Sequence, residues 1–392
     1  MRRVSIEERR ARLARRHHLA SSARTNDVGA VARDLVGLHA TDPASIVLSA
    51  TARMKKPSAE AVPRALYEDR TLLRMLGMRR TLFVEPLDLV PVVQSAASRA
   101  VAVRERARLV KFLTEAGIAK DPGRWLRKVE KAAMAALSAR ESATAGELAA
   151  AVPELGKKLV LGRGKKYEAE VSISSRVLLL LAADGHVVRG QPRGSWISTQ
   201  YRWSTAERWL GAAITHVPVE EARASLLRSW LGAFGPGTLT DLKWWTGWSA
   251  GEVRKALTSV DPVEVELDGG GVGLVLSDDL ARVRPTKPWI ALLPSLDATT
   301  MGWKDRDWYL GPHGPELFDR MGNAGPTIWC DGRVVGGWAQ RRDGEIAYRL
   351  VEDIGRAATA VVGAAAEAVG KLVGDIRYTP RFPTPLEREL RG

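Results

Sequence analysis

Apolar residues recur at helical spacing along the first third of the chain. Their stripes predict three helices, over residues 6–18, 28–39 and 58–67. Between the second and third of these, Thr41-Asp42-Pro43 ends the helical pattern, because the residue before a proline avoids the α region. Residues 72–84 then predict two short strands on either side of Gly77. Three helices followed by a strand pair are typical of a winged-helix unit.

The same order of elements is predicted twice more along the chain. In the second copy the expected helices cover residues 125–139, 145–151 and 171–183. A hairpin is then expected from strands at 187–189 and 196–198, with Arg193 at its polar tip. In the third copy the expected helices cover 219–234, 238–245 and 249–258, and the strands cover 263–267 and 272–276. The copies share their element order but little residue identity.

The pattern changes after residue 285, where short apolar strands alternate with Gly and Asp turns. The expected strands cover residues 288–294, 327–330, 334–338 and 346–350, and Asp331-Gly332 is a hairpin signal. An Ala-rich buried helix at 356–373 is expected to pack on them. The predicted fold class is therefore α+β, mainly helical, with three tandem winged-helix units followed by a small C-terminal β-barrel. The expected domains are residues 1–120, 121–210, 211–284 and 285–392.

The chain is strongly basic, with 59 Lys and Arg residues against 45 Asp and Glu residues and a formal charge of +14. Such a field attracts polyanions, and binding to nucleic acid is further favoured by release of counterions. A basic composition shared by a whole proteome, or a solvated basic loop, is the alternative explanation. The candidate DNA contacts are Arg79, Arg80, Arg163, Lys165, Lys166, Ser174, Arg176 and Arg193.

The thirteen tryptophans and six histidines are mostly expected to be structural. Stacking on an extruded base would need only one or two tryptophans, and Trp196 and Trp303 are the candidates. His17 and His18 end a basic helix and are expected to be solvated. His39 lies at the predicted end of an apolar helix, where either a structural or a catalytic role is open.

Several classes of function are excluded by the sequence. The single cysteine, Cys330, cannot form an internal disulfide, and no Cys/His spacing fits a zinc site. The sequence contains no phosphate-binding loop, no HExxH motif and no nucleophile elbow, so no metal and no cofactor are expected. It shows neither a secretion signal nor a membrane span. A monomer in the cytoplasm of a bacterial cell, associated with the nucleoid, is expected.

Four stretches carry a resemblance to a known family. The clearest is Leu-Val-Gly-Leu-His-Ala-Thr-Asp-Pro at residues 35–43, and the others lie at 73–83, 292–306 and 326–338. These stretches resemble the AlkZ-like winged-helix DNA glycosylases, the family typified by azinomycin-resistance glycosylases. The resemblance extends over nearly the whole chain. It implies three tandem winged helices and a C-terminal β-barrel around a DNA channel, and excision of alkylated bases, including N7-alkylguanines and some interstrand crosslinks.

The resemblance also implies where catalysis would take place. The family signature is Gln, an apolar residue, then Gln or Asp, and it falls on His39, Ala40 and Thr41. In this sequence His39 could accept the proton of the attacking water, Thr41 could hold that water, and Asp42 could act as an electrostatic partner or cap the turn. His39, Thr41 and Asp42 are therefore the candidate catalytic residues.

Three hypotheses about function follow. The first is a monofunctional glycosylase that acts on damaged double-stranded DNA, since the nearest lysines, Lys55 and Lys56, lie outside the His39 region. The second is a DNA-binding protein without catalysis, either a regulator or a damage binder. The third is a winged-helix scaffold for protein interactions. Salt-sensitive affinity for DNA distinguishes the glycosylase and the non-catalytic DNA-binding protein from the scaffold. Release of a base from alkylated DNA distinguishes the glycosylase from the non-catalytic DNA-binding protein.

Overall fold

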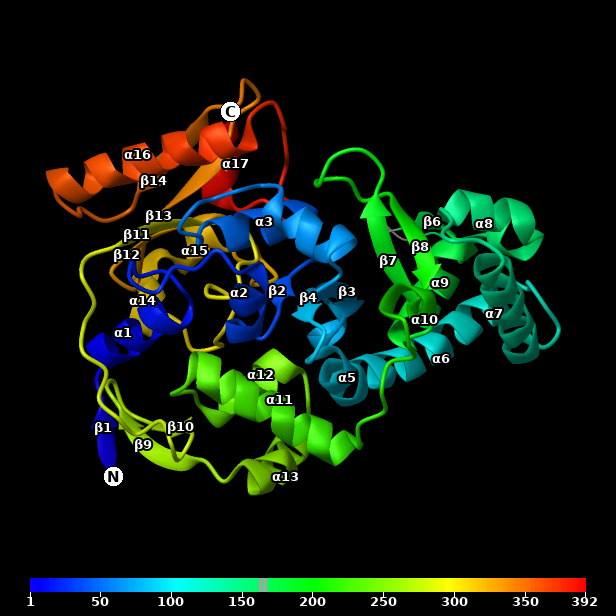
Figure 1. Cartoon of the computed structure of the whole chain (residues 1–392), viewed down its shortest axis with the longest axis horizontal. Helices are drawn as coiled ribbons and strands as arrows, with labels where there is room; N and C mark the ends of the chain where they lie inside the picture. The colour runs from blue at the N-terminus through cyan, green and yellow to red at the C-terminus, as the bar shows by residue number, and fades with distance from the viewer. Residues whose placement is uncertain (162–163, 165–167) are drawn as a thin grey trace. The chain divides into compact units, whose positions relative to one another are not determined.

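The computed structural model describes residues 1–161, 164 and 168–392 (Figure 1). It divides into two compact units. Unit 1 comprises Met1–Leu72, Phe83–Pro86 and Arg223–Gly392, and unit 2 comprises Leu73–Leu82 and Leu87–Ala222. This division is coarser than the four segments expected from the sequence, whose boundaries at 120, 210 and 284 stay predictions. Within the described residues, no helix is both long and apolar enough to cross a membrane.

Unit 2 is mainly helical, and its helix ends match the local sequence signals. Asp121 caps α7 and Pro122 occupies the first turn, where its missing N–H costs nothing. Thr144 and Glu147 form a capping box at α8. The helices of this unit are α5 (Val90–Val93), α6 (Arg99–Glu115), α7 (Pro122–Ser138), α8 (Ala145–Ala151), α9 (Ile173–Ala183) and α10 (Ala206–Leu210). The helices predicted at 125–139, 145–151 and 171–183 are confirmed.

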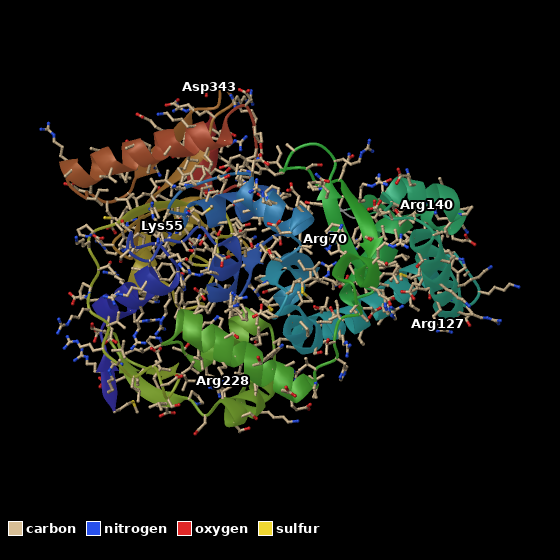
Figure 2. All side chains as sticks on the ribbon, in the orientation of Figure 1. Lys55, Arg70, Arg127, Arg140, Arg228 and Asp343 are labelled. Atoms are coloured by element: carbon tan, nitrogen blue, oxygen red, sulfur yellow. The ribbon has the colours of Figure 1, made fainter. Side chains whose placement is uncertain are left out.

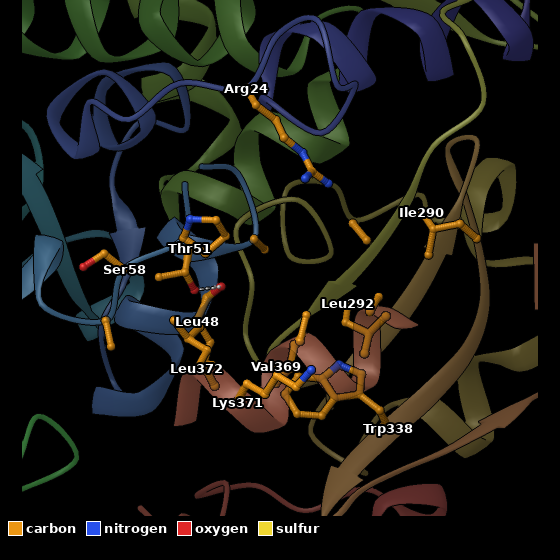
Figure 3. A pocket seen from close by; sticks show the side chains of 16 residues that line it. Arg24, Leu48, Thr51, Ser58, Ile290, Leu292, Trp338, Val369, Lys371 and Leu372 are labelled. Atoms are coloured by element: carbon orange, nitrogen blue, oxygen red, sulfur yellow. Dashed lines mark hydrogen bonds between the residues drawn. The ribbon is translucent and has the colours of Figure 1, made fainter. Parts of the chain in front are cut away.

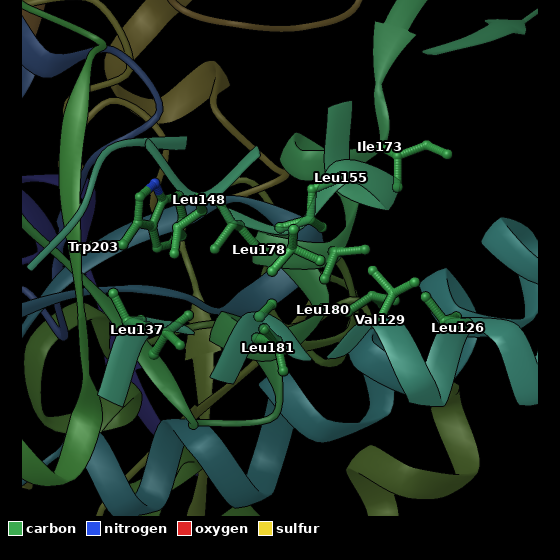
Figure 4. Close-up of a cluster of buried hydrophobic side chains, with 14 of the residues drawn as sticks. Leu126, Val129, Leu137, Leu148, Leu155, Ile173, Leu178, Leu180, Leu181 and Trp203 are labelled. Carbon is green, nitrogen blue, oxygen red and sulfur yellow. The ribbon is translucent and has the colours of Figure 1, made fainter. Parts of the chain in front are cut away.

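The core of unit 2 forms where the apolar stripes of these helices meet (Figure 4). Leu126, Val129 and Leu137 of α7 pack with Leu178 and other residues of α9, all nearly inaccessible to solvent. Burial of each such side chain contributes roughly 1.5–3 kcal/mol relative to exposure. This cluster holds α9 against the strands that follow it.

The strands of unit 2 form a hairpin after α9, but its second strand begins later than predicted. β7 (Val187–Pro192) pairs antiparallel with β8 (Tyr201–Thr205), and residues 193–200 form the loop between them. The prediction that 196–198 form the second strand was wrong. Trp203 explains the register, because it is buried in the core whereas Trp196 is only half-buried. The other strands are β3 (Leu72–Leu76), β5 (Lys158–Leu161) and β6 (Ala169–Ser172).

In unit 1, the third predicted set of helices is confirmed. These helices are α11 (Val219–Phe234), α12 (Leu239–Thr246) and α13 (Ala250–Val260), with capping boxes at Thr238 and Ser249. The antiparallel strands β9 (Val263–Leu267) and β10 (Val272–Val275) follow, as predicted. The sequence did not indicate β1 (Arg2–Val4), which pairs parallel to β9, because a three-residue strand leaves no periodic signal.

The C-terminal part of unit 1 is an antiparallel sheet of order β11-β12-β13-β14. Its strands are β11 (Ile290–Leu293), β12 (Thr327–Cys330), β13 (Arg333–Gln340) and β14 (Ile346–Leu350), so the four predicted strands are confirmed. Asp331 (φ 48°) and Gly332 (φ 83°) make the predicted tight turn, which needs two left-handed residues. Among the described strands the order is open at both ends, and the expected barrel is not confirmed.

Helices cover this sheet. The Ala-rich α16 (Arg356–Val373) packs against β11 and β14, and α17 (Pro385–Arg391) packs against β13 (Figure 1). Only one stripe of α16 is buried, including Val362 and Ala366, while Val361 is half exposed. The helix itself was predicted correctly, but the prediction that it is buried holds for only one of its faces. The short helices α14 (Asp307–Leu310) and α15 (Gly314–Leu317) complete this part.

The N-terminal part of unit 1 departs most from the prediction. Its helices are α1 (Ile6–Arg16), α2 (Val28–Asp34), α3 (Pro43–Thr51) and α4 (Ala61–Pro63). The predicted helix at 28–39 is shorter, and α3 was missed. All nine residues of α3 are buried, so the helix has no solvent-exposed face and therefore no clear amphipathic pattern to detect.

Candidate active site

The candidate catalytic residues lie on a strand rather than at the end of a helix. Val36 (φ 50°) and Gly37 (φ 91°) both adopt left-handed backbone conformations, which end the turn after α2 and direct the chain into β2 (Leu38–His39). β2 pairs antiparallel with β4 (Leu82–Pro86), and His39 lies opposite Phe83. The predicted helical position of His39 was wrong, because apolar spacing cannot distinguish a helix end from a buried strand.

Gly37 is required at this turn for a second reason. A Cβ atom at this position would lie 2.8 Å from the Cδ atom of Glu85, a fully buried residue of β4. Any larger residue would have to displace the buried carboxyl group of Glu85. The left-handed backbone and this close approach therefore both favour glycine where the chain enters β2.

His39 is held in an aromatic environment. Only 5% of its surface is exposed, and its ring packs against Phe83 with centroids 5.3 Å apart. Phe83 in turn contacts Trp245 of α12 at 6.4 Å. This packing limits the motion of the imidazole ring. Thr41, two residues later, is half-buried.

Asp42 anchors the end of the motif with both carboxylate oxygens. Oδ1 accepts the Ala44 N–H at 3.1 Å and so caps α3, with Pro43 in the first turn. Oδ2 accepts the backbone N–H of Arg381 at 3.2 Å. Because both oxygens accept backbone bonds, the arrangement supports the capping alternative for Asp42 over a direct catalytic role.

The helix that Asp42 caps is fixed to the stretch 295–299 by buried polar bonds. The guanidinium of Arg53 makes a two-bond contact with Asp297, at 2.7 and 2.9 Å, and both side chains are fully buried. Ser49 donates to the same carboxylate at 2.6 Å, and Ser45 donates to the Ser295 carbonyl at 2.6 Å. Burial alone would raise the pKa of Asp297, but the Arg53 charge and these bonds lower it below its ordinary value. The stretch therefore helps to position α3.

His17 belongs to this buried network, and its expected solvation was wrong. Its Nδ1 lies 2.8 Å from the Thr299 hydroxyl and its Nε2 lies 3.2 Å from the Ala233 carbonyl, with no solvent exposure. Burial, with the nearby charge of Arg53, lowers the pKa of His17 to about 3. The neutral imidazole is thus a packing and hydrogen-bonding element. Sequence spacing could not distinguish it from the solvated end of a basic helix.

The C-terminal segment adds a buried acid near the motif. Glu387 of α17 is 1% exposed, and burial raises its pKa to about 7 even though Arg391 lies 3.6 Å away. The charge of Asp42 raises it further, and both burial and Glu387 raise the pKa of Tyr378. The sequence showed no sign of this contact, because Asp42 and Arg381 are 339 positions apart and no local pattern connects them.

The candidate DNA contacts of unit 2 divide into exposed and buried residues. Arg80 is exposed and pairs with Glu105 at 2.8 Å, while Arg79 is half-buried. Burial lowers the pKa of Arg176, and the neighbouring charge of Arg80 contributes. The structure therefore brings Arg80 and Arg176 into one electrostatic cluster. Ser174 is 5% exposed, and its hydroxyl lies 2.6 Å from that of Ser172, so it belongs to the start of α9 rather than to a surface.

The hairpin loop at 193–200 presents the remaining candidates of unit 2. Arg193 is exposed, and its backbone N–H donates to the Gln200 carbonyl at 2.7 Å. Trp196 lies in the same loop. The candidates Arg163, Lys165 and Lys166 lie outside the described residues. The surface of this unit carries further exposed cations, among them Arg127 of α7 and Arg140, which follows that helix (Figure 2).

Trp303 is not available for base stacking. It is 2% exposed, its Nε1–H donates to the Phe234 carbonyl at 3.1 Å, and its ring packs against Trp308 at 5.0 Å. The sequence-based choice of Trp303 was therefore wrong, because a tryptophan in a turn-rich segment gives no indication of its burial.

A largely apolar cavity of about 660 Å³ lies beyond the C-terminal end of α3 (Figure 3). Leu48 and Thr51 of α3, Leu292 of β11 and Val369 of α16 line it, and Arg24 and Lys371 add two cations. Because Asp42 caps the opposite end of α3, this cavity is separated from the candidate catalytic residues by the length of that helix.

Comparisons with known proteins agree with this architecture. The family model for AlkZ-like DNA glycosylases matches residues 32–372, and the chain therefore belongs to the AlkZ-like family, so its class of enzyme is DNA glycosylase. Among solved structures, it is similar to Streptomyces sahachiroi DNA glycosylase AlkZ, with a TM-score of 0.73 and 22% identity over 95% of this chain and 97% of that one. A comparison with curated protein sequences gave no match. The structural likeness supports the fold, and the family assignment rests on the family model.

Proposed function

We propose that this DNA glycosylase excises N7-alkylated purines, or bases linked in a crosslink, with His39 and Thr41 as its catalytic residues. The observation that carries the proposal is the fixed position of the motif. β4 holds His39 from one side, and the Asp42 cap with its bond to Arg381 holds the other end. A site that positions water must be rigid in this way.

The chemistry suits these two residues. Alkylation at N7 makes guanine a cationic leaving group, so departure of the base needs little acid assistance. The enzyme then has to place a water beneath the sugar and stabilise an oxocarbenium-like state, as in other glycosidic cleavage. In the proposed mechanism, His39 accepts the proton of that water and the Thr41 hydroxyl orients it. Asp42 contributes by fixing the turn.

A monofunctional mechanism, in which water rather than an amine attacks the sugar, is part of the proposal. A bifunctional glycosylase would need a lysine at the site to form a Schiff base. Lys55 and Lys56 are exposed and follow the far end of α3. The nine residues of that helix span roughly 13 Å, which is too far for direct attack beside His39.

We further propose that winged-helix units deliver the DNA. The helices α7, α8 and α9 followed by the hairpin β7–β8, and α11, α12 and α13 followed by β9–β10, support two of the three expected units. In such units the third helix commonly enters the major groove and the hairpin contacts the backbone. The formal charge of +14 supports duplex DNA as the partner.

The experiment that tests the proposed substrate uses DNA carrying N7-methylguanine and, separately, a bis-alkylated interstrand crosslink. Wild-type protein is expected to release the modified base and leave an intact abasic site. Strand cleavage without added base would contradict the monofunctional mechanism. His39→Ala is expected to remove most of the activity while it leaves DNA affinity nearly unchanged. Full activity in this variant would show that the catalytic residues lie elsewhere.

A further inference from the structure

A second hollow, of about 800 Å³, lies on the side of unit 1 that holds Arg381. It is formed by residues 314–321, which include α15, and by residues 381–388, which lead into α17. The two helices contact each other, so the hollow is built on packed elements. Its walls carry three arginines that are all exposed, Arg320, Arg381 and Arg388.

The positive charge of this hollow is not balanced from within. Over the described part of the chain, none of the three guanidinium groups forms an ion pair, whereas neighbouring Arg391 lies 3.6 Å from Glu387. The acidic residue of the lining, Asp319, is engaged in its own turn. Its carboxylate accepts the backbone N–H groups of Met321 and Asn323, each at 2.8 Å. Three cations therefore face one carboxylate that is already hydrogen-bonded.

Apolar groups lie between these charges. Met321 is 86% exposed, which is unusual for so large an apolar side chain, and Phe382 lies half-buried beside Arg381. Cations interleaved with apolar and aromatic surface suit a nucleotide, whose phosphate pairs with arginine and whose sugar and base pack on carbon. An acidic protein segment would use the cations but would leave the aromatic surface without a partner.

The hollow is joined to the candidate active site through the backbone. The N–H of Arg381 donates to Oδ2 of Asp42 at 3.2 Å, and Asp42 directly follows Thr41. The residue that places one guanidinium in the hollow is thus hydrogen-bonded to the end of the catalytic motif. A DNA strand that enters the site would present its neighbouring phosphates to these arginines.

We infer that this hollow binds the DNA backbone beside the nucleotide whose base is excised. Arg320 and Arg388 contact phosphates through their planar guanidinium forks, and Phe382 supports the adjoining sugar or base. This inference rests on the proposed function, because it takes the motif at His39 as the point of excision. It adds a binding surface outside the winged-helix elements.

The test measures the affinity of the full chain for a short duplex with a central tetrahydrofuran abasic-site analogue, over a series of salt concentrations. The double variant R320Q/R388Q removes two charges and retains side-chain length. The matched control, R342Q/R356Q, removes two exposed arginines of the same C-terminal part that lie outside the lining. We expect R320Q/R388Q to lose affinity by roughly tenfold or more, with the log-log salt slope reduced by about two. The control is expected to stay within about twofold of wild type.

A second duplex locates the contact. It carries uncharged methylphosphonates in place of the phosphates that flank the abasic analogue. Wild-type protein is expected to bind it more weakly than the native duplex, and R320Q/R388Q is expected to bind both equally. R381Q, whose backbone N–H still reaches Asp42, should behave like the double variant to a smaller degree.

Three results would overturn the inference: unchanged affinity in R320Q/R388Q, an equal loss in the control pair, or a variant that still discriminates between the two duplexes. If the variant still discriminates between the two duplexes and an acidic peptide displaces DNA from the wild-type protein, a protein partner would be favoured instead. Because the tetrahydrofuran duplex has no base to release, these results do not depend on excision. A failure to excise N7-methylguanine would therefore contradict the proposed function and leave this binding test intact.

Discussion

Asp42 and Arg381 lie 339 residues apart in the sequence, and a hydrogen bond joins them at the end of the proposed catalytic motif. The same carboxylate caps α3 through Ala44. One side chain thus connects the strand that carries His39, the helix that follows it and the C-terminal segment. This geometry leads to the first prediction.

Asp42→Ala is expected to destabilise unit 1 by about 2–4 kcal/mol, because the helix cap is lost and the Arg381 N–H is left without its acceptor. Asp27→Ala is the matched control. Asp27 is an exposed cap of α2 in the same unit, and it accepts only the Ala30 N–H at 3.1 Å. Its loss should cost about 1 kcal/mol. Urea unfolding measures both values, and equal losses would show that the bond to Arg381 contributes nothing.

The second prediction concerns the buried ion pair of Arg53 and Asp297. Arg53→Met should cost about 3–5 kcal/mol, because it leaves a fully buried carboxylate without its partner. Arg341→Met removes an exposed pair with Glu345 and should cost less than about 1 kcal/mol. Thermal unfolding of the two variants compares them. A similar small effect in both would show that the network does not fix α3.

The third prediction concerns pH. The pKa of Glu387 is about 7 in the folded chain, against an ordinary value of 4.5. Between these two pH values the folded state therefore holds a proton that the unfolded state releases. Stability contributed by the protonated form is present below pH 4.5 and is lost as the pH rises toward 7, by roughly 3 kcal/mol in total. Glu387→Gln should therefore stabilise the protein at pH 8 and change little at pH 4.

The measurement is urea unfolding of wild type and variant across that range. Since the two proteins share every other titrating group, their difference isolates Glu387. Glu389→Gln, on the exposed face of the same helix, serves as control and should shift the curve by less than about 1 kcal/mol at any pH. A difference between Glu387→Gln and wild type that is flat from pH 4 to 8 would contradict the raised pKa.

The fourth prediction concerns the hairpin loop of unit 2. Arg193→Ala should weaken binding to all duplex sequences alike, and it should reduce the log-log salt slope by about one, as expected for one lost phosphate contact. Arg127→Ala removes an equally exposed cation from α7 and should leave the slope unchanged. Anisotropy titrations at several salt concentrations decide the matter. An unaltered slope for Arg193→Ala would mean that this arginine is merely solvated.

The fifth prediction separates the roles proposed for His39 and Thr41 in catalysis. His39→Ala should lower base excision by roughly 10²- to 10⁴-fold, the usual contribution of a general base. Thr41→Ala should cost less, since the proton acceptor remains in place. His39→Gln should retain or raise activity on N7-methylguanine, because it places at that position the residue that the family signature carries. Single-turnover excision rates measure all three, and a Thr41→Ala defect larger than that of His39→Ala would reverse the assigned roles.

Elements with a local pattern could be predicted from the amino-acid sequence alone. The amphipathic helices α7, α9 and α13, the four strands of the C-terminal sheet and the Asp331-Gly332 turn were all predicted from spacing and turn residues. Periodicity works for α7 and α13 because one face of each helix is buried and the other is wet. The mostly buried strands were predicted instead from short apolar runs between turn residues. The motif at His39 was also found from the sequence, through its resemblance to a family.

Features that depend on residues far apart in the sequence became visible only in the folded chain. α3 is buried on every side and so has no periodic signal, and His39 lies on a strand only because β4 pairs with it. The burial of His17 and Trp303, the pair of Arg53 with Asp297, and the bond from Arg381 to Asp42 all join segments far apart in the chain. Local sequence records which residues can be buried, but only packing determines which of them meet.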